Sequence, residues 1–477
     1  MLFNSFPFIS LFLPIVTIVY ALARMYFGQR MAQAFLLAAS FFFYGYAKPS
    51  YVPLLAGSIL FNWAIASWMG SAQDHAGTSA SRRKMLLWIG LAANIILLCS
   101  FKYVNFFLQC FAFLNPQRLN LPNWAFPLGI SFFTLTQIMY LVDTYQGLNA
   151  PSTLFDHATL VSFFPYVSSG PLVRSRVVIP QFKSFTMSVG RFDLACRGLY
   201  LFSLGLTKKV VLADSFARIA DAGFGSVQNF STFEAWVFSL SYTFQIYFDF
   251  SGYSDMAVAC AWMLGIDIPQ NFNAPYRSKS ISEFWKRWHI SLSNFITDYL
   301  YTPILRSMGK ATVTTSAIAI LVAMAIAGLW HGPAWTFVIF GTLHGGALAV
   351  NQVWRRRKKK MPAWLGWLVT FVFVNITFVF FRSANASSAL RMLNAMLPHA
   401  HLVGVAALRG VLPLAPSLLL RPVAIGIVLA FFFKTAQQFA ETFRPTHLTA
   451  FATATLILLC MFFMNSTAAK EFVYFAF

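Results

Sequence analysis

Hydrophobic runs separated by short polar or basic connections recur along the whole chain. A membrane-spanning helix needs about 20 predominantly apolar residues, and many of the runs approach that length. We therefore expect an all-α polytopic membrane protein with roughly ten to twelve membrane-spanning helices. No polar stretch is long enough for a separate soluble domain, so we expect residues 1–477 to form a single integral-membrane domain. The candidate spans are residues 7–22, 33–46, 51–69, 85–113, 124–142, 192–212, 233–262, 311–330, 333–353, 362–381, 421–437 and 447–465.

Residues 280–296 follow the pattern of an amphipathic helix. Ser280 and Glu283 form a capping box, which predicts that a helix begins at Ile281. Glu283 then lies one turn before Arg287 and is expected to pair with it. The polar face is too charged for a simple span, so we expect this helix at the membrane interface or in a cavity wall. The apolar face, at 3.6 residues per turn, comprises Ile281, Trp285, Trp288, His289, Leu292, Phe295 and Ile296.

Residues 311–330 and 333–353 predict a helical hairpin with the sequence Trp-His-Gly-Pro at its turn. Basic residues stand before the first helix and after the second, at Arg355–Lys360, which favours a cytoplasmic location for both ends. His331 is then near the turn, displaced toward the outer side or dipping into the membrane core. His344 follows thirteen residues later, which is no metal-binding spacing. We interpret it as a packed or hydrogen-bonded core histidine.

Two earlier stretches combine polar residues with membrane-like hydrophobicity. Residues 129–147 form a candidate span with several polar side chains, which join helices by hydrogen bonds or line a wet cavity. Residues 163–174 contain two prolines and a glycine in one apolar run, which is compatible with a re-entrant segment or an ordinary loop. Asp249 and Asp255 are six residues apart and do not share a helix face, and Gly252 is a candidate helix break between them. Hydrogen bonding between helices, or a proton path, is the interpretation of these two carboxylates.

Composition supports the membrane assignment. The chain is 58% hydrophobic, with a mean hydropathy of +0.64, and it carries 35 Lys and Arg against 14 Asp and Glu. The positive-inside rule and contact with anionic lipid headgroups account for this excess, and no basic polar face indicates nucleic-acid binding. The five cysteines lack zinc-binding spacing, so we expect no metal site. The basic residues between the runs include Arg24, Arg30, Arg82–Lys84, Lys208–Lys209 and Arg355–Lys360.

Residues 242–345 carry the candidate chemistry, because His289 and His331 stand there among aromatic and aliphatic residues. A neutral imidazole accepts protons near physiological pH, and burial in apolar surroundings favours that neutral form. Ionisable residues inside a membrane are costly and typically functional. We therefore predict an active site within the membrane. No GxSxG motif supports a serine hydrolase.

Five segments in order resemble the membrane-bound O-acyltransferase (MBOAT) family, in the branch of bacterial alginate O-acetylases. They are GISFFTLTQIMYLVDTYQG, FFPYVSSGPLVR, YFDFSGYSDMA, NFNAPYRSKSISEFWKRWHISLS and GLWHGPAWTFVIFGTLHG, and the resemblance spans roughly residues 1–380, with a family core at about 125–355. The resemblance implies a helical fold around a central tunnel, with amphipathic or re-entrant helices. It implies that His331 is catalytic and that His289 is the second family position near the reaction centre.

The resemblance also implies the transfer of an acetyl group from a cytoplasmic thioester to an extracytoplasmic glycan. The donor is acetyl-CoA or an acyl-carrier protein, used as a substrate, with no bound cofactor. We expect Trp285, Trp288 and Trp330 to line the tunnel that receives it. The expected location is a bacterial inner membrane, and the expected partners are lipids and a separate periplasmic or membrane-tethered acetyltransferase. The acceptor is alginate, cellulose, peptidoglycan or a similar glycan, or a partner protein that passes the group on.

Two readings from other classes stay open. The first is a transporter or flippase for a glycan or lipid, with the histidines as a proton relay, although the chain lacks the internal repeat that many transporters show. The second is a non-catalytic scaffold that recruits a secreted acetylase. Within the enzyme reading, an acyl-histidine intermediate and direct transfer are both compatible with the sequence. Consumption of a labelled acetyl thioester distinguishes the enzyme from the other two classes.

Overall fold

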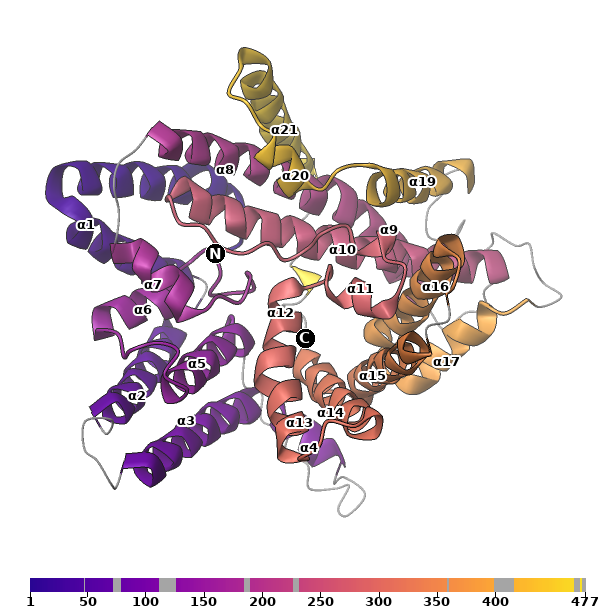
Figure 1. Cartoon of the computed structure of the whole chain (residues 1–477). Coiled ribbons are helices and arrows are strands. Elements are labelled where there is room, and N and C mark those ends of the chain that lie inside the picture. Colours follow the sequence, from indigo (N-terminus) through magenta and orange to yellow (C-terminus); the bar gives the residue numbers. More distant parts are fainter. Residues whose placement is uncertain are drawn as a thin grey trace. The chain divides into compact units, whose positions relative to one another are not determined.

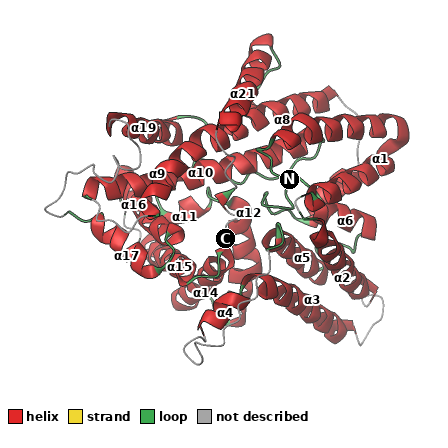
Figure 2. Ribbon diagram, turned by 180° about the vertical axis from the view of Figure 1, so that it is seen from behind, coloured by secondary structure: helices red, strands yellow, loops and turns green. Residues whose placement is uncertain are grey.

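The computed structural model describes residues 1–46, 48–71, 79–110, 126–183, 189–225, 231–357, 360–398, 416–466 and 472–473. Every regular element in these ranges is a helix (Figure 1 and Figure 2). Lys358 and Lys359 of the predicted basic loop, and residues 111–113 and 124–125 of two candidate spans, lie outside the described residues.

Within these ranges, six helices are long and apolar enough to cross a membrane. The candidate spans at 7–22 and 33–46 lie on either side of a kink at Gly28 within the helical stretch Phe8–Gly45. The backbone at Gly28 is non-helical, with φ 81° and ψ 178°, a conformation that glycine tolerates. The candidate span 421–437 is wrong as a single helix, because one helix ends at Phe432 and the next begins at Ala436. The remaining candidate spans fall mainly on Ile130–Tyr145, Val189–Thr207, Lys208–Ala213, Thr232–Met263 and Trp335–Arg356. The six long apolar helices are Phe8–Gly45, Pro49–Gly70, Ala80–Lys102, Val313–His331, Ala363–Arg382 and His447–Asn465.

The chain divides into two compact units. The first contains Met1–Phe202, Met256–Pro269 and Pro445–Thr449, and the second contains Ser203–Asp255, Gln270–Arg444 and Ala450–Phe477. That the whole chain acts as a single domain stays a prediction.

The first unit is built on a helix packing of α2, α3 and α5. Ile65, Leu86 and Leu141 meet in its apolar core, and Gly90 of α3 lets Leu141 approach closely. The helices of this unit are η1 (Phe8–Phe12), α1 (Leu13–Gly45), η2 (Pro49–Tyr51), α2 (Val52–Ser71), α3 (Ser79–Lys102), α4 (Val104–Cys110), α5 (Ile130–Tyr145), α6 (Leu154–Ser162), α7 (Ser175–Lys183) and most of α8 (Val189–Thr207).

The segment between α6 and α7 is irregular and buried. Residues 163–173 are all buried, and their backbone forms turns instead of a helix. Non-helical backbone in a membrane protein is tolerated where surrounding protein covers it. The irregular backbone at 163–174 is compatible with both the re-entrant segment and the ordinary loop that the sequence leaves open, and residues 163–173 are packed inside the protein.

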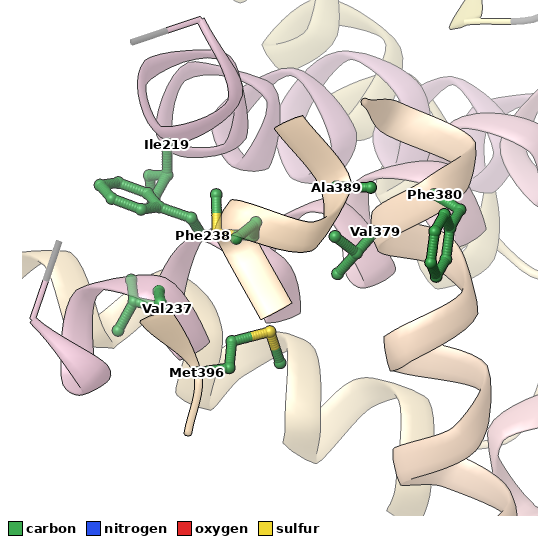
Figure 3. Packing of buried hydrophobic residues seen from close by; sticks show 9 residues of the cluster. Ile219, Val237, Phe238, Val379, Phe380, Ala389 and Met396 are labelled. Atoms are coloured by element: carbon green, nitrogen blue, oxygen red, sulfur yellow. The ribbon is translucent and has the colours of Figure 1, made fainter. Parts of the chain in front are cut away.

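The second unit places its helices around α10 and the α14–α15 hairpin. A cluster from α9, α10, α16 and α17 forms one part of its core, in which Phe238 packs near Val379 and Met396 (Figure 3). The elements of this unit are η5 (Lys208–Ala213), α9 (Asp214–Phe224), most of α10 (Thr232–Met263), η6 (Pro275–Arg277), α11 (Ile281–Trp285), α12 (Ile290–Phe295), η7 (Ile296–Tyr301), α13 (Thr302–Ser307), α14 (Val313–His331), α15 (Trp335–Arg356), α16 (Ala363–Arg382), α17 (Ala386–Ala395), α19 (Pro416–Phe432), α20 (Ala436–Glu441) and most of α21 (His447–Ser466).

Glycines set two close helix contacts in this unit. A Cβ on Gly328 of α14 would lie 2.3 Å from the carbonyl oxygen of Phe337, and one on Gly341 of α15 would lie 2.2 Å from that of Met324. The predicted hairpin is therefore confirmed as a close backbone-to-backbone pair. Gly252, by contrast, does not break α10, which continues through it. A Cβ there would lie 2.7 Å from the carbonyl oxygen of Gly205, so Gly252 serves close packing against α8.

Candidate active site

Helix α11 forms one wall of the site, and it begins at Ile281, as the sequence predicts. The Ser280 hydroxyl accepts a hydrogen bond from the Glu283 backbone N–H at 3.2 Å, which caps a helix that starts at Ile281. The Glu283 carboxylate then pairs with Arg287 at 2.8 Å, one turn later. Both contacts are local in sequence. The capping box is only half formed, because the Glu283 carboxylate accepts from the Lys279 backbone N–H at 2.9 Å instead of that of Ser280.

The predicted continuous helix over 280–296 is wrong. α11 ends at Trp285, α12 begins at Ile290, and His289 between them has a left-handed backbone with φ 43° and ψ 54°. For a non-glycine residue that conformation costs about 1–3 kcal/mol. The irregular segment 271–273 stabilises this backbone conformation. The Asn273 N–H donates to the Arg287 carbonyl and the Ile290 N–H donates to the Asn271 backbone carbonyl, both at 2.9 Å.

The burial pattern predicted for this segment nevertheless holds. All seven residues assigned to the apolar face are buried in the structure, including Trp288 and His289. The amphipathic pattern therefore identified the correct residues with the wrong backbone.

His289 is fully buried in an aromatic environment. Phe250 meets its ring edge-on with centroids 4.6 Å apart, and Phe272 stacks on it at 6.4 Å. Its Nδ1 lies 3.2 Å from the side-chain oxygen of Asn271. Burial lowers the pKa of the His289 imidazole to about 3, so the ring is neutral at physiological pH.

His331 is the last residue of α14 and is also buried. The rings of Trp330, Phe381 and Phe340 surround it at centroid distances of 5.1, 5.3 and 6.1 Å. The chain leaves the helix at Gly332, which has extended backbone. A Cβ at that position would lie 2.2 Å from the Phe337 ring, so only glycine admits this aromatic packing beside His331.

A continuous series of aromatic contacts joins the two histidines. Phe272, which stacks on His289, packs edge-on against Trp288 at 5.0 Å. Trp288 packs against Phe378 at 5.3 Å, Phe378 meets Phe381 at 6.3 Å, and Phe381 contacts His331. Trp288 and Trp330 thus belong to the aromatic packing that surrounds the histidines. The catalytic roles of the two histidines stay predictions, which this common environment supports.

A cavity of about 480 Å³ lies beside this aromatic cluster, between the α11–η7 segment and the α14–α15 hairpin. Trp285, Lys286 and Met324 are among its lining residues. A second cavity of about 410 Å³ shares Ser282, Ile320 and Leu348 with it and reaches Gln352, Arg355 and Arg356. The hollow therefore runs along the hairpin from its basic end. Met324 is seven residues before His331, or roughly 10 Å along the helix at 1.5 Å per residue.

The second unit also contains buried ion pairs, which correct one expectation from the sequence. Lys208 and Lys209 were expected as basic residues between hydrophobic runs, but both continue α8 as the π-helical element η5. Lys209 Nζ lies 2.7 Å from Asp249 and 3.0 Å from Asp214, and Lys208 Nζ lies 2.6 Å from Asp255. A buried carboxylate is usually paired with a cation. Asp249 and Asp255, which stand in an apolar stretch, were therefore the sequence signal that Lys208 and Lys209 are buried. Their interpretation as links between helices is confirmed.

Among the described residues, no group of three or more His, Cys, Asp or Glu could hold a metal ion. The site offers a buried neutral imidazole, a second histidine in the same aromatic environment, and an adjoining cavity with cations at its far end. Such an arrangement suits proton transfer in a region that excludes water.

A multi-pass helical membrane protein with histidines buried in its core is the class that the fold and site define. The chain belongs to the membrane-bound O-acyltransferase family, whose match covers residues 42–389. It is therefore an O-acyltransferase.

Three relatives place the chain within the family. It is 40% identical over 427 residues to the peptidoglycan O-acetyltransferase of Helicobacter pylori, covering 83% of this chain and 80% of that protein. It is 37% identical over 403 residues to the probable alginate O-acetylase AlgI of Pseudomonas aeruginosa, covering 83% and 75%. The teichoic acid D-alanyltransferase of Bacillus subtilis is 28% identical over 283 residues, covering 56% and 71%.

Proposed function

We propose that the protein moves an acetyl group from a cytoplasmic thioester across a bacterial inner membrane for O-acetylation of a cell-envelope glycan. The observation that carries the proposal is the burial of His331 at the end of α14, in one aromatic environment with His289. Two relatives are named for the O-acetylation of peptidoglycan and alginate, which supports a glycan hydroxyl as the final acceptor.

In the proposed reaction, His331 accepts the proton of the attacking hydroxyl while the hydroxyl oxygen forms a bond to the thioester carbonyl carbon. The carbon–sulfur bond breaks, and the proton passes from His331 to the leaving thiolate. General-base catalysis of this kind contributes about 10²–10⁴-fold. The surrounding rings of Trp330, Phe340 and Phe381 exclude water, which suppresses hydrolysis of the thioester. His289 relays the proton.

The cavity along the hairpin suits the donor. Acetyl-CoA and an acyl-carrier protein both present the thioester on a long arm that carries phosphate, and Lys286, Arg355 and Arg356 line the hollow. Cations attract phosphate, while the apolar lining toward Trp285 and Met324 suits the uncharged part of the arm. This supports Trp285 as a donor-side residue. Trp288 and Trp330 would instead shape the reaction centre.

The test is thioester consumption by purified protein in lipid vesicles. Radiolabelled acetyl-CoA and an acetylated carrier protein are offered separately, with a polysaccharide or peptidoglycan fragment outside, and free thiol and acetylated glycan are measured. We expect thiol release with at least one donor, and its loss in His331→Ala. Movement of glycan without thiol release would support the transporter alternative and overturn the proposal.

A further inference from the structure

The side chain of Asn271 makes an unusually complete set of contacts beside His289. It is buried, and its Oδ1 accepts from the backbone N–H and the hydroxyl of Ser291 at 3.2 and 2.9 Å. The same atom lies 3.2 Å from Nδ1 of His289. Its Nδ2 donates to the Ser254 hydroxyl at 3.2 Å.

These contacts determine which imidazole nitrogen carries the proton. A backbone N–H can only donate, so the Asn271 atom facing Ser291 must be the carbonyl oxygen and not the amide nitrogen. A carbonyl oxygen can only accept, so Nδ1 of His289 must be the donor in their contact. A neutral imidazole has one N–H, which leaves the lone pair on Nε2.

We infer that Asn271 is a positioning residue that holds His289 in the Nδ1–H tautomer and makes Nε2 its proton-accepting nitrogen. Asn271 also stabilises the backbone, because its main-chain carbonyl accepts a hydrogen bond from the N–H of Ile290, the residue immediately after the left-handed His289. One residue therefore fixes the ring's protonation pattern and the backbone conformation that aims it. The inference deepens the proposed function, on which the catalytic use of His289 rests.

The chemical consequence is that the lone pair of His289 is always on Nε2. In solution a neutral imidazole exchanges between two tautomers, and only one of them would present a lone pair to a given reacting group. With Nδ1–H committed to Asn271, every neutral His289 presents Nε2 in the same direction. A relay through His289 would then take up a proton at Nε2 and return it from the same atom.

Two variants and one control test the inference. Asn271→Leu keeps the approximate size and removes the acceptor, whereas Asn271→Asp keeps an acceptor and adds a negative charge beside Nδ1. Asn273→Ala is the matched control, since it changes the same residue type on the same segment while leaving its backbone bond to Arg287 in place. Each is compared with the wild type by ¹⁵N NMR of histidine-labelled protein in lipid, with His289→Ala identifying the His289 signals, and by pH–rate profiles of thiol release.

In the wild type and in Asn273→Ala we expect His289 to show a protonated Nδ1 and an unprotonated Nε2. Asn271→Leu should lose that preference and lose at least tenfold in kcat with little change in KM. In Asn271→Asp the tautomer should persist, while the added charge raises the pKa of His289 by about 1–3 units. The acidic limb of its pH–rate profile should therefore move to higher pH.

The inference is overturned if wild-type His289 carries its proton on Nε2, or if Asn271→Asp leaves the acidic limb where it is. Should Asn271→Leu fail to fold, Asn271→Asp still decides between these outcomes. The NMR signal is independent of turnover. A correct tautomer in a protein that consumes no thioester would contradict the proposed function alone, and the opposite tautomer in an active enzyme would contradict the positioning role alone.

Discussion

Trp285 donates a hydrogen bond from its indole Nε1 to Nδ1 of His344 across 3.2 Å. Because an indole N–H only donates, Nδ1 must accept and the proton of the neutral ring lies on Nε2. Nε2 is 2.9 Å from the Thr377 hydroxyl, which in turn donates to the Val374 carbonyl. Both nitrogens of His344 are therefore engaged in packing the hairpin against α11 and α16, as expected for a core histidine.

The proposed role of His331 as the base gives the first prediction. His331→Ala should leave stability nearly unchanged and reduce thiol release by about 10²-fold or more, because the base is removed. His331→Gln keeps much of the shape but cannot accept a proton in this pH range, so it should fail almost as badly. The measurement is donor turnover on matched amounts of folded protein.

His344→Ala is the matched control for that experiment. It leaves the Trp285 and Thr377 groups without their partner, at a cost of about 1–3 kcal/mol for each buried unsatisfied group. We expect a lower midpoint of thermal unfolding and a smaller loss of turnover per folded molecule. Near wild-type activity in His331→Gln would show that His331 is structural.

A second prediction concerns the buried lysines. Lys209→Met would leave Asp214 and Asp249 as uncompensated charges, which typically costs about 3–5 kcal/mol. Arg197→Ala removes a half-exposed i,i+4 pair with Asp193 at 2.8 Å and should cost about 0–1 kcal/mol. Thermal unfolding in detergent checks both. Equal shifts for the two variants would show that the Lys209 cluster is well hydrated.

A third prediction concerns the basic end of the cavity. The double variant Arg355→Glu, Arg356→Glu should raise the KM for a phosphate-bearing donor about tenfold at low salt, with kcat little changed and the effect weakened by added salt. Arg357→Glu changes the next exposed residue of the same basic run. Donor titrations at two ionic strengths provide the measurement, and equal effects of the two variants would mean that only general surface charge matters.

A fourth prediction tests orientation. The basic run at Arg355–Lys360 should hold the end of the hairpin in the cytoplasm, at about 1 kcal/mol for each residue near an anionic leaflet. In a cysteine-free background, a cysteine at exposed Met361 or at Gln352 should resist a membrane-impermeant thiol reagent in whole cells. Permeabilised cells provide the control, in which Met361→Cys should be labelled. Ready labelling from outside would reverse the assigned orientation.

A fifth prediction concerns the partner that completes the reaction. We expect the protein alone to consume donor slowly and to leave the polymer unmodified, because a separate periplasmic or membrane-tethered acetyltransferase transfers the group to the glycan. Reconstitution with and without an envelope extract, followed by analysis of acetyl esters on the polymer, measures this. Full acetylation by the purified protein alone would remove the need for the partner.

Local signals predicted the parts of the fold that local interactions decide. The start of α11 follows from Ser280 and Glu283, and the α14–α15 hairpin follows from two apolar runs around a Gly-Pro turn. The helical periodicity of 281–296 identified residues that are buried in the structure, although the helix itself is broken. His331 and His289 were identified through motifs, and the structure adds their common aromatic surroundings.

The features that the sequence did not predict depend on contacts between residues far apart in the chain. The helix break at His289 depends on two backbone hydrogen bonds, from the Ile290 N–H to the Asn271 carbonyl and from the Asn273 N–H to the Arg287 carbonyl, and nothing within the helical pattern signals them. Lys208 and Lys209 resemble a cytoplasmic basic pair until Asp249 and Asp255, some 40 to 47 positions later, are placed beside them. The role of Asn271 required the geometry of three donors around one oxygen.

The glycine contact between α14 and α15 has a consequence for biogenesis. Gly328 and Gly341 are only thirteen positions apart, so their contact can form as soon as the nascent chain has delivered the hairpin to the bilayer. The α14–α15 hairpin, which carries His331, can therefore begin to pack before the later segments of the chain are inserted. A bulky substitution such as Gly328→Val should accordingly act during insertion, lowering the yield of inserted protein more than the turnover of each molecule that matures.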